Sequence, residues 1–233
     1  MEEFMTASFW LAVGQIIMID ILLGGDNAVV IALACRNLPA KQRTQGIIYG
    51  TIGAIVLRVI LIAFALALLA VPYLKIVGAV LLVWIGIKLL QPEGAEDHSI
   101  SSSDKLWSAV KTVIVADLVM SVDNVLAIAG AAQGAGQQHQ LPLVIFGLLV
   151  SIPIIVFGSQ IVLKLMERFP VIITLGAMLL GWIAGQMAYS DPAIKAYLPA
   201  AGYWSYVAAA CGAAFVLVVG KSLQHRKAAQ AKA

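Results

Sequence analysis

The sequence predicts an all-α, polytopic membrane protein with seven transmembrane helices. Of its 233 residues, 61% are hydrophobic and 12% are charged, and the mean hydropathy is +0.96. A soluble domain would be about 25% charged. The apolar residues gather in seven long stretches, and the first half of the chain resembles the second half. These observations exclude a soluble enzyme, and the excess of 15 Lys and Arg over 12 Asp and Glu is too small for a nucleic-acid binder.

The seven stretches are defined by breaks at polar, proline and glycine residues. A membrane helix needs about 20 predominantly apolar residues. The predicted spans cover residues 9–35, 46–71, 74–90, 107–132, 141–165, 170–189 and 203–220. We expect one transmembrane domain over residues 1–233: a first repeat (9–90), a cytoplasmic linker (91–106), a second repeat (107–189), a seventh helix (203–220) and a basic tail (221–233).

The positions of Lys and Arg predict the orientation. Twelve of these residues flank the span ends that share one side of the membrane, and two, Lys75 and Lys195, lie on the other side. Cationic loops stay in the cytoplasm. We therefore expect the N-terminus outside and the C-terminus in the cytoplasm. The membrane that we expect under the leading hypothesis below is the bacterial inner membrane. Arg58 is the remaining cation and falls within a span.

The two halves of the chain align with each other. At an offset of 97, ten of the twenty-five residues from 10 to 34 match, including Trp10 with Trp107 and both aspartates of the first span. At an offset of 98 the third span matches the sixth. Because each unit has three helices, the second unit starts from the opposite side of the membrane. The pattern predicts an inverted three-plus-three repeat plus one extra helix, an arrangement that in transporters places the substrate between the repeats.

Four aspartates lie well inside the predicted spans. A charge at the membrane centre costs about 2.5–3.5 kcal/mol, so four could cost on the order of 10 kcal/mol without compensation. Both copies place Asp, five residues, then Asp-Asn, which gives the candidate metal ligands Asp20, Asp26, Asn27, Asp117, Asp123 and Asn124. On an unbroken helix, Asp26 would point about 120° away from Asp20. We expect Gly24-Gly25 to break the first motif helix so that these ligands can converge.

Carboxylate and carboxamide oxygens suit hard divalent cations such as Mg²⁺, Ca²⁺ and Mn²⁺. Softer metals would recruit Cys or His, whereas the histidines fall in predicted loops or the tail: His98, His139 and His225. Met18 and Met120, near the motifs, could favour Mn²⁺ through a thioether, or could be apolar filler. Cys35 and Cys211 show no paired spacing and are expected to be small core residues.

The acidic residues also allow other interpretations. They could form a structural network with Arg58, or relay protons without a metal. Arg58 could be a counter-ion to an aspartate or a substrate ligand. Lys88 could reach the interface with its long side chain or serve as a gate. We expect Trp84 and Trp182 to be packing residues.

The motifs Gly24-Gly25-Asp26-Asn27 and Ser121-Val122-Asp123-Asn124, with their preceding aspartates, resemble those of the TerC family. The resemblance covers nearly the whole chain. It implies seven spans with the N-terminus outside, an association with tellurium resistance, and export of manganese as found for several members. It also implies that the six candidate ligands above belong to the family's acidic motif.

The leading hypothesis is a proton-coupled exporter of a divalent cation, most notably Mn²⁺. The alternatives are a Ca²⁺ transporter, or an accessory membrane protein in metal or tellurite resistance or in metalation of secreted proteins. An intramembrane enzyme is not expected, because no nucleophile with an adjacent base accompanies the aspartates. We expect no tightly bound cofactor, since the divalent cation would be the cargo. The expected partners are that cation, the bilayer and a homo-oligomer or membrane partner, and no nucleic acid.

Overall fold

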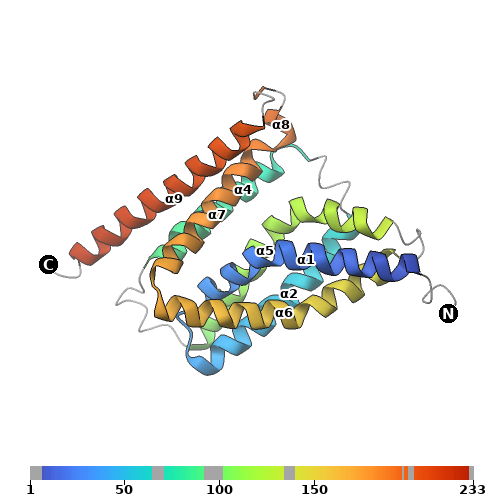
Figure 1. Ribbon diagram of the computed structural model, residues 1–233. Coiled ribbons are helices and arrows are strands. Elements are labelled where there is room, and N and C mark those ends of the chain that lie inside the picture. The colour runs from blue at the N-terminus through green and yellow to red at the C-terminus, as the bar shows by residue number, and fades with distance from the viewer. Residues whose placement is uncertain are drawn as a thin grey trace.

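The computed structural model describes residues 7–64, 71–91, 102–133, 140–195, 197–198 and 202–230. These residues form helices joined by short turns, which confirms the all-α fold class (Figure 1). The helices are α1 (Ala7–Cys35), α2 (Ala40–Ala63), α4 (Leu74–Leu90), α5 (Ser102–Gln133), α6 (Gln140–Arg168), α7 (Val171–Tyr189), α8 (Pro192–Lys195) and α9 (Tyr203–Gln230).

The helix bounds follow most of the predicted spans, with differences at several ends. α2 begins at Ala40 instead of residue 46, α5 begins at Ser102 inside the predicted linker, and α9 runs to Gln230 through most of the predicted tail. The added turns of α2 and α9 are rich in Lys, Gln and Arg, which are good helix formers. At its other end α2 stops at Ala63 instead of residue 71, with Phe64 as its C-cap, and residues 65–70 lie outside the described residues. Apolarity therefore predicted where the helices lie but not where each one begins and ends. Residues 92–101 of the predicted linker lie outside the described residues.

Four helices are long and apolar enough to cross a membrane, as judged by their length and composition. They cover Ala40–Ile62, Ile145–Arg168, Val171–Tyr189 and Tyr203–Arg226. In α1, the described apolar segment Gly25–Cys35 is shorter, and α4 has 17 residues. The chain is thus confirmed as a helical protein with several apolar spans. The other three spans and the orientation stay predictions.

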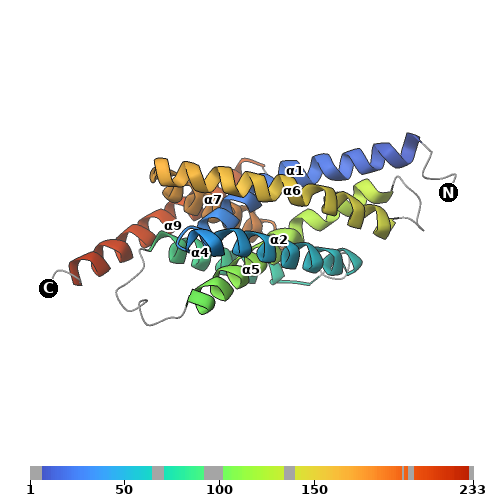
Figure 2. The ribbon, with the colours of Figure 1, turned by 90° about the horizontal axis from the view of Figure 1, so that it is seen from below.

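The long helices form two groups that lie side by side. α1, α2, α5 and α6 make a four-helix group, and α4, α7 and α9 make a three-helix group inclined to it (Figure 1). Within the four-helix group, α1 packs along α6 (Figure 2) and α2 packs along α5, whereas α1 and α2 touch little. Each half of the chain therefore packs mainly against the other half.

The pattern of helix pairs is symmetric under one exchange. Replacing α1 by α5, α2 by α6 and α4 by α7 turns the α1–α6 pair into the α5–α2 pair, and both are extensive. The α1–α5 and α4–α7 pairs are unchanged by it. α9 has no counterpart in the exchange, and it packs mainly on α7.

An apolar cluster joins the two groups. It combines Val30 of α1 with side chains of three other helices, namely Ala79, Leu82 and Ile85 of α4, Ala116, Val119, Met120 and Val122 of α5, and Leu180, Ala184 and Met187 of α7. Only small and medium-sized side chains occupy it, so the helices approach closely.

Glycines set the closest approach, between α7 and α9. A Cβ at Gly181 would overlap the carbonyl of Gly212, and one at Gly185 would overlap the carbonyl of Ala208. Gly46 and Gly50 likewise pack within the chain, since a Cβ at Gly50 would lie 2.9 Å from Val113. In lipid, burial itself gives helices no reason to associate, so this close backbone contact provides much of the attraction.

The ends of α4 are held by residues distant in sequence. At its start, the buried carboxylate of Asp191 accepts hydrogen bonds from the backbone N–H groups of Tyr73 (3.1 Å), Lys75 (3.1 Å) and Ile76 (3.2 Å). It also accepts one from Ala193 (2.8 Å), at the start of α8. Asp191 thereby satisfies N–H groups that a helix start leaves unpaired. Its bond to Tyr73 also holds that residue in the left-handed conformation, with φ 64°.

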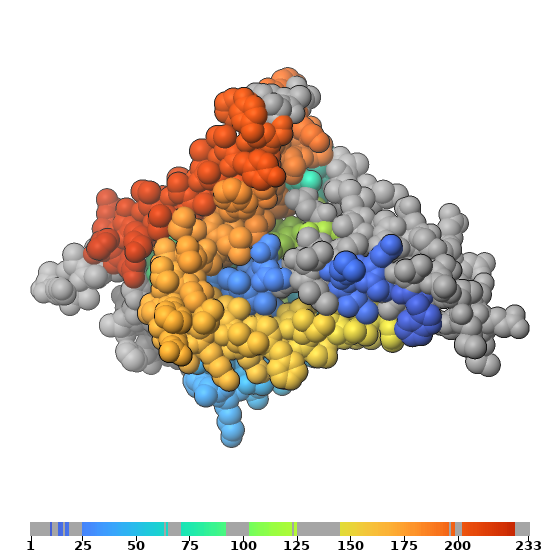
Figure 3. Space-filling model, viewed as in Figure 1, coloured from blue at the N-terminus to red at the C-terminus, as the bar shows by residue number. Residues whose placement is uncertain are grey.

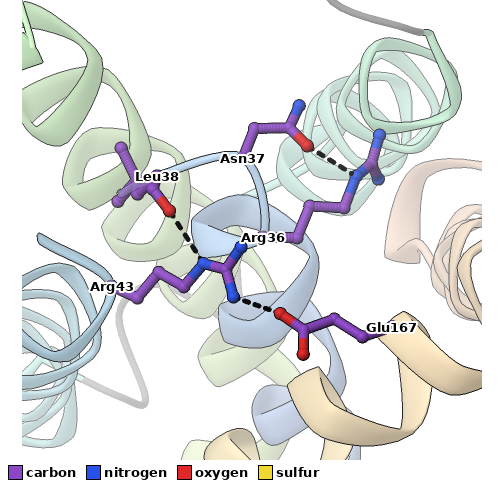
Figure 4. A network of polar contacts seen from close by, with 5 residues as sticks. All are labelled: Arg36, Asn37, Leu38, Arg43 and Glu167. Atoms are coloured by element: carbon purple, nitrogen blue, oxygen red, sulfur yellow. Dashed lines mark hydrogen bonds and ion pairs between the residues drawn. The ribbon is translucent and has the colours of Figure 1, made fainter. Parts of the chain in front are cut away.

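The other end of α4 is held from the α1–α2 turn. Arg36 donates to the carbonyl oxygens of Leu89 (2.5 Å) and Gln91 (3.4 Å), where the helix leaves acceptors unpaired. Figure 4 shows the neighbouring contacts: Arg36 donates to Asn37, and Arg43 donates to the Leu38 carbonyl and pairs with Glu167 of α6. Some of the cations that predict orientation thus also fasten helices together.

Replacing Gly185 by Ala should destabilise the protein by about 1–3 kcal/mol, because the added methyl overlaps the backbone of α9. The thermal unfolding midpoint in detergent is the measurement. Gly14→Ala in α1 is the control, since nothing lies within 4 Å of its added Cβ. Equal midpoints for the two variants would contradict the close packing of α7 on α9.

Replacing Asp191 by Ala should cost about 2 kcal/mol, because the side chain caps two helices. Burial would raise the pKa of the Asp191 carboxyl, but the hydrogen bonds from Ala193, Tyr73, Ile76 and Lys75 outweigh it and hold the pKa below its ordinary value. A lowered pKa in the folded state stabilises the protein above the ordinary pKa, and this stability is lost as the pH falls through the folded value. Unfolding midpoints measured below about pH 4 should therefore fall more steeply for the wild type than for Asp191→Ala. Parallel pH profiles would contradict this role.

Candidate metal centre

Buried polar side chains concentrate in the four-helix group. Apart from Asp191, every buried polar or charged side chain in the described part of the chain belongs to α1, α2, α5 or α6: Asn27, Thr51, Arg58, Asp117, Ser121, Ser151 and Ser159. In the described part of the chain, the interior of the three-helix group is apolar. The polar interior therefore lies where the two halves of the chain pack against each other.

A ring of hydrogen bonds joins α2 to α5 in this interior. Arg58 Nη2 donates to Asp117 Oδ1 at 2.5 Å, and Arg58 Nε donates to Ser121 Oγ at 3.1 Å. Ser121 Oγ in turn donates to Asp117 Oδ2 at 3.1 Å. Arg58 is 2% exposed and Asp117 is 6% exposed. Each carboxylate oxygen of Asp117 thus has a donor from the protein itself.

This geometry gives Arg58 the counter-ion role that was one of its two expected roles. A buried ion pair must have its remaining polar groups satisfied to be tolerated, and Ser121 supplies that satisfaction. Asp117 was predicted as a metal ligand, and in this structure it is paired with Arg58. Whether it also binds a metal stays a prediction.

The first motif presents a different environment. Asp26 is half-buried, and Asn27 is 3% exposed. Neither the amide nitrogen nor the amide oxygen of Asn27 has a hydrogen-bond partner. Leaving such a group unpaired in an interior costs about 1–3 kcal/mol. Figure 3 shows this part of α1 between α6 and α7.

The expected break at Gly24-Gly25 is wrong, because α1 is one continuous helix from Ala7 to Cys35. Two interior glycines cost about 1 kcal/mol each, whereas unpaired backbone groups in hydrocarbon cost several kcal/mol each. The helical hydrogen bonds therefore prevail. On a continuous helix Asp26 and Asn27 point about 100° apart, so ligands for one ion must come from more than one helix.

The second motif is described only in part. Asn124 is half-buried in α5. The side chains of Asp20 and Asp123 lie outside the part of the chain that the structure describes, although both positions are helical. Among the described side chains, no three His, Cys, Asp or Glu residues come close enough to hold a metal ion. The six-residue metal site therefore stays a prediction.

Several secondary expectations can be compared with the structure. Met120 is buried in the apolar cluster between the helix groups, which favours its interpretation as filler, and Met18 is exposed.

Lys88 is exposed and stacks over Trp84 at 5.3 Å. Trp84 is itself 58% exposed, so it is not a core residue. Both cysteines are free: Cys35 is buried as expected, but Cys211 lies on the exposed face of α9.

Sequence reasoning missed four members of the polar interior, namely Ser121 as a partner of the ion pair, Thr51, Ser151 and Ser159. A signal for Thr51 was present, because it precedes Arg58 by seven residues and so shares its helix face. Asp191 was missed because its partners lie more than a hundred residues away.

The fold and this interior define a class: a helical integral membrane protein with charged groups held between two similar halves. The chain belongs to the TerC family of integral membrane proteins, whose family model matches residues 5–228. This confirms the resemblance of its motifs to that family.

Three relatives are similar to this chain over most of their own length. The uncharacterized membrane protein YjbE of Bacillus subtilis is 43% identical over 183 residues, covering 78% of this chain and 81% of that protein. YceF of the same organism, also uncharacterized, is 28% identical over 78% of this chain and 72% of its own. The inner membrane protein YgdQ of Escherichia coli is 23% identical over 69% of this chain and 73% of its own. No solved protein structure matches the chain.

Replacing only one member of the Arg58–Asp117 pair should destabilise the protein more than replacing both. Arg58→Met or Asp117→Leu alone removes the opposite charge from its buried partner and should cost about 3–5 kcal/mol. The double variant should recover much of that loss. Unfolding midpoints of the three variants in detergent form the double-mutant cycle.

Glu167→Gln is the control for this cycle, because it removes an exposed ion pair with Arg43 and should cost less than about 1 kcal/mol. Additive losses in the Arg58 and Asp117 variants would mean that the two side chains do not interact.

Proposed function

We propose that this chain exports a divalent cation, foremost Mn²⁺, across the bacterial inner membrane in exchange for protons. In this proposal the cation is bound between the two repeats by residues of the paired motifs, Asp20, Asp26, Asn27, Asp117, Asp123 and Asn124. The inner membrane location is supported by the apolar helices and by the printed name of YgdQ.

The observation that carries the proposal is that, among the described residues and apart from Asp191, the buried polar side chains belong to the four-helix group. A bilayer protein retains such groups at a cost, and they commonly mark an ion path. Arg58 is a single cation, whereas four aspartates lie in the predicted spans. One arginine cannot neutralise four carboxylates, so the interior keeps negative charge with which to attract a cation.

The symmetric helix pairing supports a mechanism of alternating access. When two inverted repeats pack against each other, an exchange of their conformations moves the opening from one side of the membrane to the other. The extensive α1–α6 and α2–α5 pairs are related by such an exchange. The motif helices α1 and α5 also pack against each other, which supports a cation site at the interface of the repeats.

Export needs a source of energy. Moving two positive charges out against a negative-inside potential costs about 4.6 kcal/mol per 100 mV. The sequence has no Gly-rich phosphate-binding loop of the Walker type. Aspartates that alternate between a metal-bound carboxylate and a protonated acid would couple the cation to incoming protons.

Purified protein in proteoliposomes should move Mn²⁺ when a pH gradient is imposed. Asp26→Asn and Asp123→Asn should each lower the initial rate by at least about tenfold, because each removes a charged ligand from the path. Asp104→Asn is a matched control, since Asp104 is an exposed acid in the first turn of the same helix as Asp123. Comparing Mn²⁺ with Ca²⁺, Mg²⁺ and Zn²⁺ identifies the cargo.

Flux that persists in both motif variants would contradict the assigned site. Faster transport of Ca²⁺ than of Mn²⁺ would identify Ca²⁺ as the transported ion and leave the proposed mechanism unchanged. Absence of flux for every cation, from folded protein, would favour an accessory role in a membrane complex.

A further inference from the structure

Thr51 is a buried hydroxyl that the proposed metal site does not use. It lies on α2, is 1% exposed, and its Oγ1 has no hydrogen-bond partner. Three other helical hydroxyls behave differently. Each donates to the carbonyl four residues earlier: Thr112 to Ser108 (2.8 Å), Ser151 to Gly147 (3.2 Å) and Ser159 to Ile155 (2.8 Å).

That difference is informative, because a helical threonine can bond to its own backbone at little cost. Thr51 has the carbonyl of Ile47 in the same position and does not use it. Valine has the same shape without a polar atom to bury, so threonine has no packing advantage at this position. The hydroxyl is therefore oriented for a group that is not part of its own helix.

The face of α2 that carries Thr51 points into the four-helix group. Seven residues separate Thr51 from Arg58, which is two helical turns or about 10 Å. Arg58 reaches Asp117 across this interior. Thr51 is therefore aligned with the ion pair but lies nearer the start of α2, which is the cytoplasmic end in the proposed orientation.

Asn27 of α1 also has buried side-chain atoms without a partner, as does Gln42 near the start of α2, and by helical rise Asn27 lies between Thr51 and Arg58. Gly46 of α2 abuts Cys35 of α1, since a Cβ there would lie 3.0 Å from the Cys35 sulfur. Counted from that level by the helical rise, Thr51 lies about 7.5 Å further along its helix, Asn27 about 12 Å and Arg58 about 18 Å. Thr51 and Asn27 therefore both lie between the cytoplasmic end and the ion pair.

We propose that the Thr51 hydroxyl and the Asn27 amide oxygen form a binding position for a divalent cation on the cytoplasmic side of the Arg58–Asp117 pair. This inference rests on the proposed function and adds Thr51 to its path. Two neutral oxygens suit a hard cation that still keeps part of its water shell. They would hold the cation more weakly than carboxylates, so that it can pass on to them.

The test compares Thr51→Val with wild type in detergent and in proteoliposomes. Binding of Mn²⁺ is followed by loss of the electron paramagnetic resonance signal of the free ion, and transport by initial rates over a range of internal Mn²⁺ concentrations. Thr51→Val should weaken binding and raise KM by about tenfold. Its unfolding midpoint should equal or exceed that of wild type. Thr51→Ser, which keeps the hydroxyl, should restore binding.

Thr112→Val is the matched control, because it removes a hydroxyl that already bonds to its own helix. Wild-type binding in Thr51→Val would overturn the inference, and so would binding in Thr51→Ser as weak as that in Thr51→Val. Mn²⁺ binding that depends on Thr51 without any flux would contradict export and keep this binding position. Flux that does not depend on Thr51 would support export and contradict this binding position. Absence of Mn²⁺ binding by wild type would overturn both the export proposal and the binding position.

Discussion

Arg58 places a full positive charge inside the four-helix group, and the packing around it follows from the need to compensate that charge. Its guanidinium contacts both Asp117 and Ser121, so one side chain of α2 fixes the rotation of α5 about its axis. Because α5 also packs on α1 and α4, that rotation determines which faces of the two motif helices meet. The pair also makes the two halves of the chain chemically unequal, since α6, the counterpart of α2, has no Lys or Arg before Lys164.

Much of the fold could be predicted because a bilayer leaves a chain few choices. Apolar stretches long enough to span must be helical, so the predicted spans and the observed helices nearly coincide. The start of α2 and the end of α9 extend beyond the predicted spans because Lys, Gln and Arg continue a helix after the apolar stretch stops. The aligned aspartates indicated two related halves, but which helix packs along which could not be predicted. That depends on small residues such as Gly181 and Gly185, whose partners lie on another helix.

The candidate site was predictable in composition and not in geometry. Charge inside an apolar span identified the aspartates and Arg58, because such charge is costly wherever it occurs. The choice of Asp117 as the partner of Arg58 depends on how α2 and α5 are rotated, which no local pattern reveals. The expectation of a broken helix at Gly24-Gly25 failed for a related reason. Glycine lowers the stability of a helix by about 1 kcal/mol, but breaking the helix in lipid would leave backbone groups unpaired at a higher cost.

The seventh long helix, α9, has a consequence for the energies of transport. It packs chiefly on α7 and has no equivalent beside α4. If the two repeats exchange conformations, α9 keeps the same neighbour in both states. The two conformations then differ in free energy. One of them is favoured at rest even with no ion bound. In the proposed carrier, the helix outside the repeat would thus favour one of the two orientations when no ion is bound.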